Sequence, residues 1–163
     1  MATKSTKRPA MRLVFSATQG SADAFVETEI QTGLSTLGKT AYRILEVGLQ
    51  LSNIPNVNGA NIEFALSRAS DTTVAAINDR SMLYRNYASV IFTTSGATYQ
   101  PSVYRWQPLE DANVIIVEEV IYAQLDSGST SQTNVAKGYI LIEPLDITEA
   151  DRTALIAQSL GNY

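Results

Sequence analysis

The chain has 163 residues, which is the size of one domain, and 45% of them are hydrophobic, which is enough to build a core. It contains no cysteine and no histidine, and this excludes disulfides, thiolate metal sites and catalysis by a cysteine nucleophile or a histidine base. No apolar run approaches the roughly eighteen residues of a membrane span, and the N-terminus lacks the apolar core of a secretory signal, so we expect a soluble chain.

Charge is distributed unevenly along the chain, whose net charge is −4. Lys4, Lys7, Arg8 and Arg12 lie in the first twelve residues, which contain no acid, so the remainder is acidic. We expect residues 1–11 to form a flexible basic arm. Such an arm is solvated, or it contacts phosphates or an acidic neighbouring subunit; four charges without interleaved aromatic residues would bind nucleic acid only weakly.

Short alternating segments separated by turn residues follow the arm and continue to about Ile147, a rhythm typical of a β-sandwich or barrel. In the third segment, Leu45, Val47, Leu49 and Leu51 recur at every second position, which predicts one buried face of a strand. The first four strands are expected at residues 12–18, 24–32, 40–52 and 61–68.

The second half of the chain is less regular. Residues 71–85 predict an irregular excursion that overlaps the start of the fifth strand, and Pro101 predicts an edge or bulged sixth strand. Pro144 is expected to close the last strand. The remaining strands are expected at residues 82–92, 98–106, 113–126 and 135–143, with a turn at 94–96 and a polar loop at 127–134.

The spacing of apolar residues changes after Ile147 from the alternation of a strand to that of a helix. Thr148 and Asp151 approximate a capping box, which predicts a C-terminal helix that ends at Gly161. The fold class that follows is all-β: an eight-stranded antiparallel sandwich, best matched by a jelly roll. We expect a jelly-roll domain over residues 12–147 and a helix over 148–163 that packs on this domain or is exchanged from it.

Carboxylates give little sign of catalysis. Glu118 and Glu119 are neighbours in a predicted strand, so they point to opposite faces, and one that faced the core would need a partner such as an arginine. Glu27 and Glu29 share a face, where a solvated surface is a better interpretation than a hydrolytic pair. No catalytic residue, metal or cofactor is therefore predicted.

A calcium site is the weaker alternative for the loop acids, because their spacing matches no EF-hand. The loop at residues 127–131 contains no glycine pattern that would cradle a phosphate. The acids in question are Asp71, Asp79, Glu110 and Asp111.

Aromatic and arginine residues cluster in the middle of the chain. Tyrosine, tryptophan and arginine are enriched in interface hot spots, so we predict a subunit interface there. Ordinary core and surface roles, or a sugar platform in a lectin-like sandwich, are the alternatives. The strongest interface candidates are Tyr84, Tyr87, Tyr104, Arg105 and Trp106, and the cluster also holds Arg80, Arg85 and Tyr99.

The segment VIYAQLDSGSTSQTNVAKGYILIEP at residues 120–144 resembles the last hairpin of small single jelly-roll capsid proteins from tailless icosahedral bacterial and archaeal viruses. The basic arm, eight strands and end helix resemble the same family as an architecture. The resemblance implies a non-enzymatic virion protein, made in the host cytoplasm, that self-assembles into an icosahedral shell.

The partners implied are copies of the same chain and, in some family members, a second capsid protein. Arm contacts with neighbours, genome or an internal membrane would come from Lys4, Lys7, Arg8 and Arg12. The rival functions are a carbohydrate-binding or adhesive module and, with least support, a carboxylate-dependent glycosidase.

Overall fold

The computed structural model describes residues 4–5, 9–35, 37–52, 59–89, 91–93, 96–98, 103–109, 114–128, 130 and 132–160. Over these residues it contains strands and one helix, with the following bounds: β1 (Lys4–Ser5), β2 (Met11–Thr18), β3 (Val26–Gln31), β4 (Thr40–Ser52), β5 (Asn61–Ser67), β6 (Met82–Ser89), β7 (Ile91–Thr93), β8 (Gly96–Thr98), β9 (Val103–Trp106), β10 (Ile115–Ile116), β11 (Val120–Gly128), β12 (Val135–Asp146) and α1 (Glu149–Leu160).

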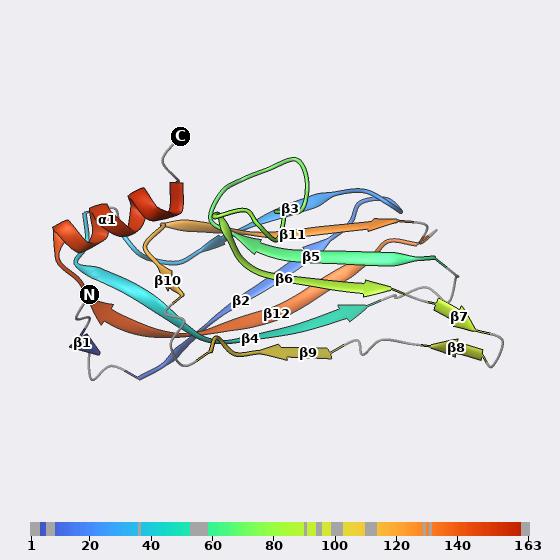
Figure 1. The fold of residues 1–163 in the computed structure, drawn as a ribbon, viewed down its shortest axis with the longest axis horizontal. Helices are drawn as coiled ribbons and strands as arrows, with labels where there is room; N and C mark the ends of the chain where they lie inside the picture. Colours follow the sequence, from blue (N-terminus) through green and yellow to red (C-terminus); the bar gives the residue numbers. More distant parts are fainter. Residues whose placement is uncertain are drawn as a thin grey trace.

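Two antiparallel sheets stack face to face (Figure 1). The first sheet has the order β2–β12–β4–β9, and the second has the order β3–β11–β5–β6. Consecutive strands mostly alternate between the sheets, and, apart from β5 and β6, strands adjacent in a sheet are distant in sequence. This strand order is that of a jelly roll, so the predicted eight-stranded fold class is confirmed.

One core fills the space between the sheets. Phe15 of β2 stacks on Phe64 of β5 with ring centroids 5.3 Å apart, so the two sheets meet through aromatic rings. Phe64 is fully buried, as are Ile62 and Leu66 at alternate positions of the same strand. Each such side chain stabilises the fold by roughly 1.5–3 kcal/mol relative to an exposed one.

The third strand matches its expected bounds, but its alternation is interrupted by a β-bulge. Leu141 pairs with Glu46 and Ile142 pairs with Ile44, so Leu45 is the extra residue. Ile44 consequently lies in the core with Val47 and Leu49, whereas Leu45 is only half-buried. The prediction that Leu45 shares the buried face was therefore wrong.

The last strand extends further than predicted. Pro144 does not close it, because β12 continues to Asp146 and Pro144 lies in register with Tyr42 of β4. Proline is compatible with a strand beside a bulge, where the ladder is already irregular.

The predicted strand at residues 113–126 is two strands in different sheets. β10 pairs with β4 in the first sheet, and β11 pairs with β3 and β5 in the second. The chain crosses between them at residues 117–119, where Thr32 Oγ1 donates to the Glu118 carbonyl at 2.7 Å and Thr32 N–H donates to the Glu119 carbonyl at 2.9 Å.

The predicted strands at 82–92 and 98–106 are also divided. β6 ends at Ser89, and β7 and β8 form a separate hairpin across the predicted turn. The hairpin extends from the end of the sandwich opposite α1 (Figure 1). β9 begins only at Val103, and Pro101 lies outside the described residues. Residues 68–81, between β5 and β6, are irregular as predicted.

The C-terminal helix begins as the capping box predicts. Asp151 N–H donates to Thr148 Oγ1 at 3.1 Å, and Thr148 Oγ1 donates to Asp151 Oδ2 at 2.8 Å. Leu155 and Ile156 pack on a small second cluster of Ala41, Ile115, Val117, Leu145 and Ile147. The helix thus lies on its own domain. The expected end at Gly161 is outside the described residues.

Candidate interface surfaces

Three of the predicted interface residues meet across the two sheets. The ring of Tyr84 on β6 lies 5.4 Å from that of Trp106 on β9 and 6.3 Å from that of Phe64. Tyr84 is buried, and Tyr104 and Trp106 are half-buried against the core. The structure therefore places Tyr84 in the core, while Tyr104 and Trp106 lie at its margin.

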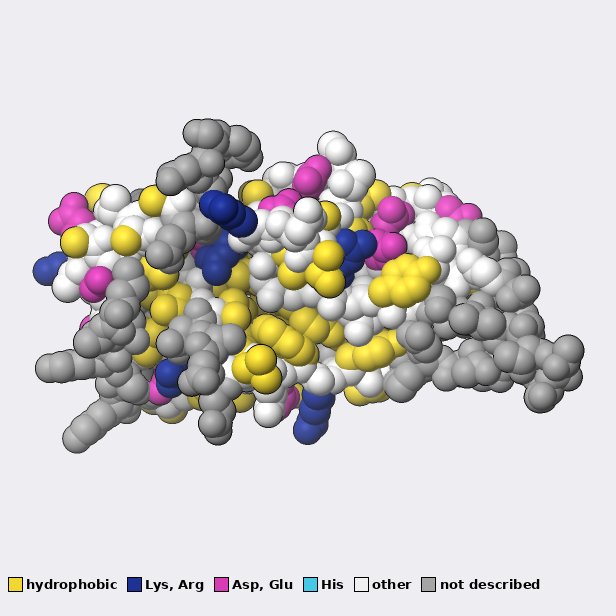
Figure 2. Space-filling model, viewed as in Figure 1, with side chains coloured by type: hydrophobic (Ala, Val, Ile, Leu, Met, Phe, Trp, Pro, Cys, Tyr) yellow, Lys and Arg dark blue, Asp and Glu magenta, His cyan; other side chains and the backbone are white. Residues whose placement is uncertain are grey.

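This margin is an open edge of the sandwich. Among the described residues, β6 pairs only with β5, and β9 pairs only with β4, so each strand has one side without a strand partner. Figure 2 shows hydrophobic side chains between the two sheets along this edge. Unpaired strand edges and exposed apolar surface both favour association with another chain.

Tyr104 has an unusual hydroxyl on this edge. Its Oη is buried, and within the described part of the chain it has no hydrogen-bond partner. Burial raises the pKa of Tyr104, and burial is also the main reason that the pKa of Tyr84 is raised. Buried hydroxyls nearly always have a partner, and one without a partner among the described residues costs stability.

The other predicted interface residues lie on the outer faces of the two sheets. Arg105 belongs to the outer face of the first sheet, and its side chain is 75% exposed. Tyr87 belongs to the outer face of the second sheet, opposite Glu63. These two candidates therefore lie on opposite sides of the sandwich.

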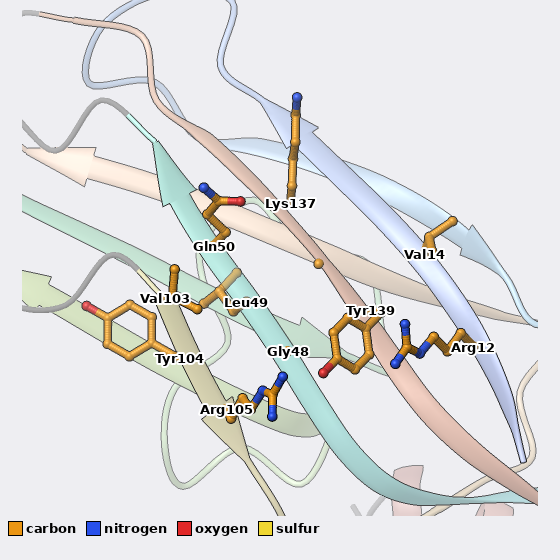
Figure 3. Close-up of a pocket in the computed structure, with 11 residues that line it drawn as sticks. Arg12, Val14, Gly48, Leu49, Gln50, Val103, Tyr104, Arg105, Lys137 and Tyr139 are labelled. Carbon is orange, nitrogen blue, oxygen red and sulfur yellow. The ribbon is translucent and has the colours of Figure 1, made fainter.

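A groove crosses the outer face of the first sheet (Figure 3). The groove has a volume of about 330 Å³, and Gly48 and Gly138, which lack side chains, form part of its floor. Exposed Val14 and Val103 flank it, and three cations from three strands surround it. Its lining residues are Arg12, Val14, Gly48, Leu49, Gln50, Val103, Tyr104, Arg105, Lys137, Gly138 and Tyr139, and none of them is acidic.

Tyr139 is fixed in the middle of the groove. Its hydroxyl donates a hydrogen bond to Glu46 Oε1, and the guanidinium carbon of Arg12 lies 4.6 Å from its ring centroid. A Cβ at Gly48 would be only 2.4 Å from the ring, so the ring packs directly on the glycine backbone. Arg12 over the ring and the Gly48 backbone against it therefore hold the ring in place.

The carboxylate of Glu46 is fully occupied beside this groove. It accepts from Tyr139 and from Gln107 Nε2 at 3.0 Å, and Arg105 Nε lies 4.0 Å away. The hydrogen bond from Tyr139 is the main reason that the pKa of Glu46 is lowered, and the same bond raises the pKa of Tyr139. The lowered pKa keeps this carboxylate charged, but the three cations around the groove outnumber it, so the groove remains basic.

The outer face of the second sheet is acidic, a feature that the sequence analysis missed. Residues directly opposite each other in register share a face. The pairings Tyr122–Glu29, Gln124–Glu27 and Asp126–Glu63 place four carboxylates on this side. Arg85 lies opposite Ala65 on the same face and is the basic residue among these paired positions. Its Nη2 forms an ion pair with Glu63 Oε2 at 2.7 Å. The sign of each face depends on strand pairing, which sequence alone does not provide.

The arm residues are only partly placed. Lys4 lies in β1, where it is in register with Asp146 of β12, and Arg12 lines the groove. Lys7 and Arg8 lie outside the described residues, as does Tyr99 of the aromatic cluster.

The carboxylates that the sequence analysis considered for catalysis are mostly engaged in structural contacts. Glu118 and Glu119 lie at the crossing between the sheets and not within a strand as predicted, and Arg68 Nη1 donates to both oxygens of Glu118 at 3.1 Å. Glu27 accepts from Ser70 Oγ at 2.6 Å and from Gln124 Nε2 at 3.0 Å. No group of three or more potential metal ligands occurs in the described part of the chain.

The calcium hypothesis is tested only in part. Asp71 and Asp79 are exposed in the 68–81 loop, whereas Glu110 and Asp111 lie outside the described residues. Among the described residues, no helix has the length and apolar character needed to cross a membrane.

Fold and surfaces together define a single-domain jelly-roll sandwich with an open aromatic edge and outer faces of opposite charge. No protein-family model matches the chain, and no curated protein matches it. Among solved structures, the chain is similar to a structure of tomato aspermy virus determined by X-ray crystallography. The two chains are 15% identical, the match covers 92% of this chain and 85% of that one, and the TM-score is 0.42. The jelly-roll assignment rests on the strand order instead.

Proposed function

We propose that this protein is a structural virion protein, a capsid subunit that self-assembles into an icosahedral shell. The observation that carries the proposal is the open edge at β6 and β9, where each strand has one side without a strand partner among the described residues and where Tyr104 and Trp106 lie half-buried. A monomer gains nothing from such an edge, whereas repeated subunits under closed symmetry bury it.

The proposal includes a location and partners. The protein would be made in the host cytoplasm and would reside in the virion, in contact with copies of itself and in some settings with a second capsid protein. The basic arm would contact a neighbouring copy, the genome or an internal membrane. No small-molecule substrate is part of this function, and we propose no enzymatic activity.

The test is the size distribution of the purified protein by light scattering over a range of salt and protein concentrations, with electron microscopy of the large species. Closed shells or discrete symmetric rings are the expected result. A monomer in every condition, including after addition of co-expressed virion proteins, would contradict the proposal.

The alternative is a carbohydrate-binding or adhesive module, since jelly rolls also occur in lectins. The groove contains an amide and a tyrosine, as sugar sites do, but Arg12 lies over the Tyr139 ring and Gly48 lies against it. A sugar that stacks on an aromatic ring would therefore have to displace Arg12. Binding on a glycan array by a protein that never self-associates would favour this alternative.

A further inference from the structure

The irregular 68–81 loop is held rigidly on the acidic face of the second sheet, although it contains no strand or helix. Ala75 N–H donates to Gln124 Oε1 at 2.9 Å, and Arg85 Nη1 donates to the Ala75 carbonyl at 3.2 Å. Asp71 N–H donates to Glu27 Oε2 at 3.0 Å. These bonds fix the base of the loop, so it would lose little conformational entropy on binding.

The tip of this loop presents an apolar side chain beside acids. Ile77 is 79% exposed. Asp79 follows it in a tight turn, in which Asp79 N–H donates to the Ala76 carbonyl at 2.9 Å and Ser81 N–H donates to Asp79 Oδ1 at 2.8 Å. Arg80 is the base at the tip, but the sheet face around the loop is acidic through Glu27, Glu29, Glu63 and Asp126.

The groove on the opposite side of the molecule has the complementary chemistry. Arg12, Arg105 and Lys137 would face the acids, while Val103, which is 61% exposed, would cover the isoleucine. Burial of an isoleucine against a valine and pairing of opposite charges are both favourable, and charge pairing also speeds association.

We propose that the 68–81 loop of one copy inserts into the groove of a second copy, with Ile77 against Val103. This inference rests on the proposed self-assembly and names one of its interfaces. Loop and groove lie on opposite faces, so the contact is heterologous: each copy uses both surfaces, and the copies form a ring where the rotation closes.

Single-stranded nucleic acid is the competing occupant of a basic groove. It fits less well, because a base that stacks on Tyr139 would compete with Arg12 over the ring, and phosphates would leave Val103 without apolar contact. It is therefore included as an outcome of the test.

The test uses two full-length variants. Ile77→Lys alters the loop, and the double substitution Val103→Glu with Lys137→Glu alters the groove. Each variant alone should have an association constant at least about 30-fold weaker than wild type in sedimentation velocity at low salt. An equimolar mixture retains one intact loop and one intact groove, so it should form a one-to-one heterodimer that grows no further.

Leu37→Lys and Lys39→Glu are the matched controls, because Leu37 is 94% exposed and both residues lie outside loop and groove. Both controls should associate like wild type. Circular dichroism would confirm that each variant is folded.

The outcomes separate this inference from the proposed function. Wild-type shells together with unchanged association of both variants would overturn the loop-and-groove contact alone. A mixture that stays monomeric, or loss of oligonucleotide binding by the groove variant with normal self-association, would overturn it as well. A wild-type protein that never associates would contradict both proposals.

Discussion

At the scale of single residues, close contacts in the first sheet depend on glycine. A Cβ at Gly138 would lie 2.1 Å from the Gly48 carbonyl oxygen and 2.5 Å from Phe15 Cζ. One of these atoms belongs to the backbone of the central strand β4 and the other to the core, so neither side has room to move. A side chain at Gly138 would therefore collide both with β4 and with the core ring of Phe15.

We predict that Gly138→Ala lowers the free energy of unfolding by about 3 kcal/mol or more, as overpacking against backbone does. Urea unfolding followed by circular dichroism measures this change. Gly20→Ala is the control, because a Cβ there would meet nothing within 4 Å, and its effect should stay within about 0.5 kcal/mol. Equal effects of the two substitutions would show that the close approach is absent.

The Tyr139–Glu46 hydrogen bond predicts a pH dependence. The folded-state pKa of Glu46 is lowered, so its contribution to stability is present above its ordinary value of 4.5 and is lost as the pH falls through the folded pKa. The folded-state pKa of Tyr139 is raised, so its contribution is present below its ordinary value of 10.0 and is lost as the pH rises through the folded pKa.

Tyr139→Phe removes this bond and leaves the ring in place. The difference in unfolding free energy between wild type and this variant should be largest between these two limits and should shrink at both acid and alkaline extremes. Urea titrations at a series of pH values measure it. A difference that is constant with pH would mean that the bond does not form in solution.

At the scale of elements, α1 is joined to the sandwich by a buried arginine. Arg152 is 4% exposed, and its two terminal nitrogens donate to the carbonyls of Gly38 and Val117. Gly38 precedes β4, and Val117 lies at the crossing between the sheets. One side chain thus connects the helix to both places.

We predict that Arg152→Met destabilises the protein by about 2–3 kcal/mol, because it leaves two buried carbonyls without donors. Hydrogen exchange should become faster in α1 than in β4 or β12, since the helix loses its attachment first. Thr153→Ala on the exposed side of the same helix should leave exchange in the sandwich unchanged. Uniformly faster exchange in all elements would contradict this local role.

Elements were predictable where the signal is local. Alternation located the long strands, and Thr148 with Asp151 located the helix start. The bulge at Leu45 and the crossing at Glu118 were not predictable, because each depends on a partner strand: Leu141 and Ile142 in one case, Thr32 in the other. The groove has the same origin, since Arg12 and Arg105 come together only through the pairing of β2, β12, β4 and β9.

At the scale of the whole molecule, the pairings that build the sandwich are distant in sequence. β2 pairs with β12, so the two ends of the domain are neighbours in the first sheet, and neither sheet forms a contiguous stretch of chain. Neither sheet is complete without strands from both halves of the chain. The two sheets also bury the same core, so we expect them to unfold together rather than one after the other.

Trp106 allows this cooperativity to be measured, because it is the single tryptophan of the chain and its ring lies 5.4 Å from that of Tyr84 in the other sheet. Its fluorescence reports on contact between the sheets, whereas far-UV circular dichroism reports on the strands themselves. We predict that the two signals give coincident urea transitions at a protein concentration where the chain is monomeric. A fluorescence change that precedes the loss of strands would mean that the edge at β6 and β9 opens while the sheets persist. In that case the aromatic edge would be a separately mobile part of the monomer, and assembly would have to order it as well as bury it.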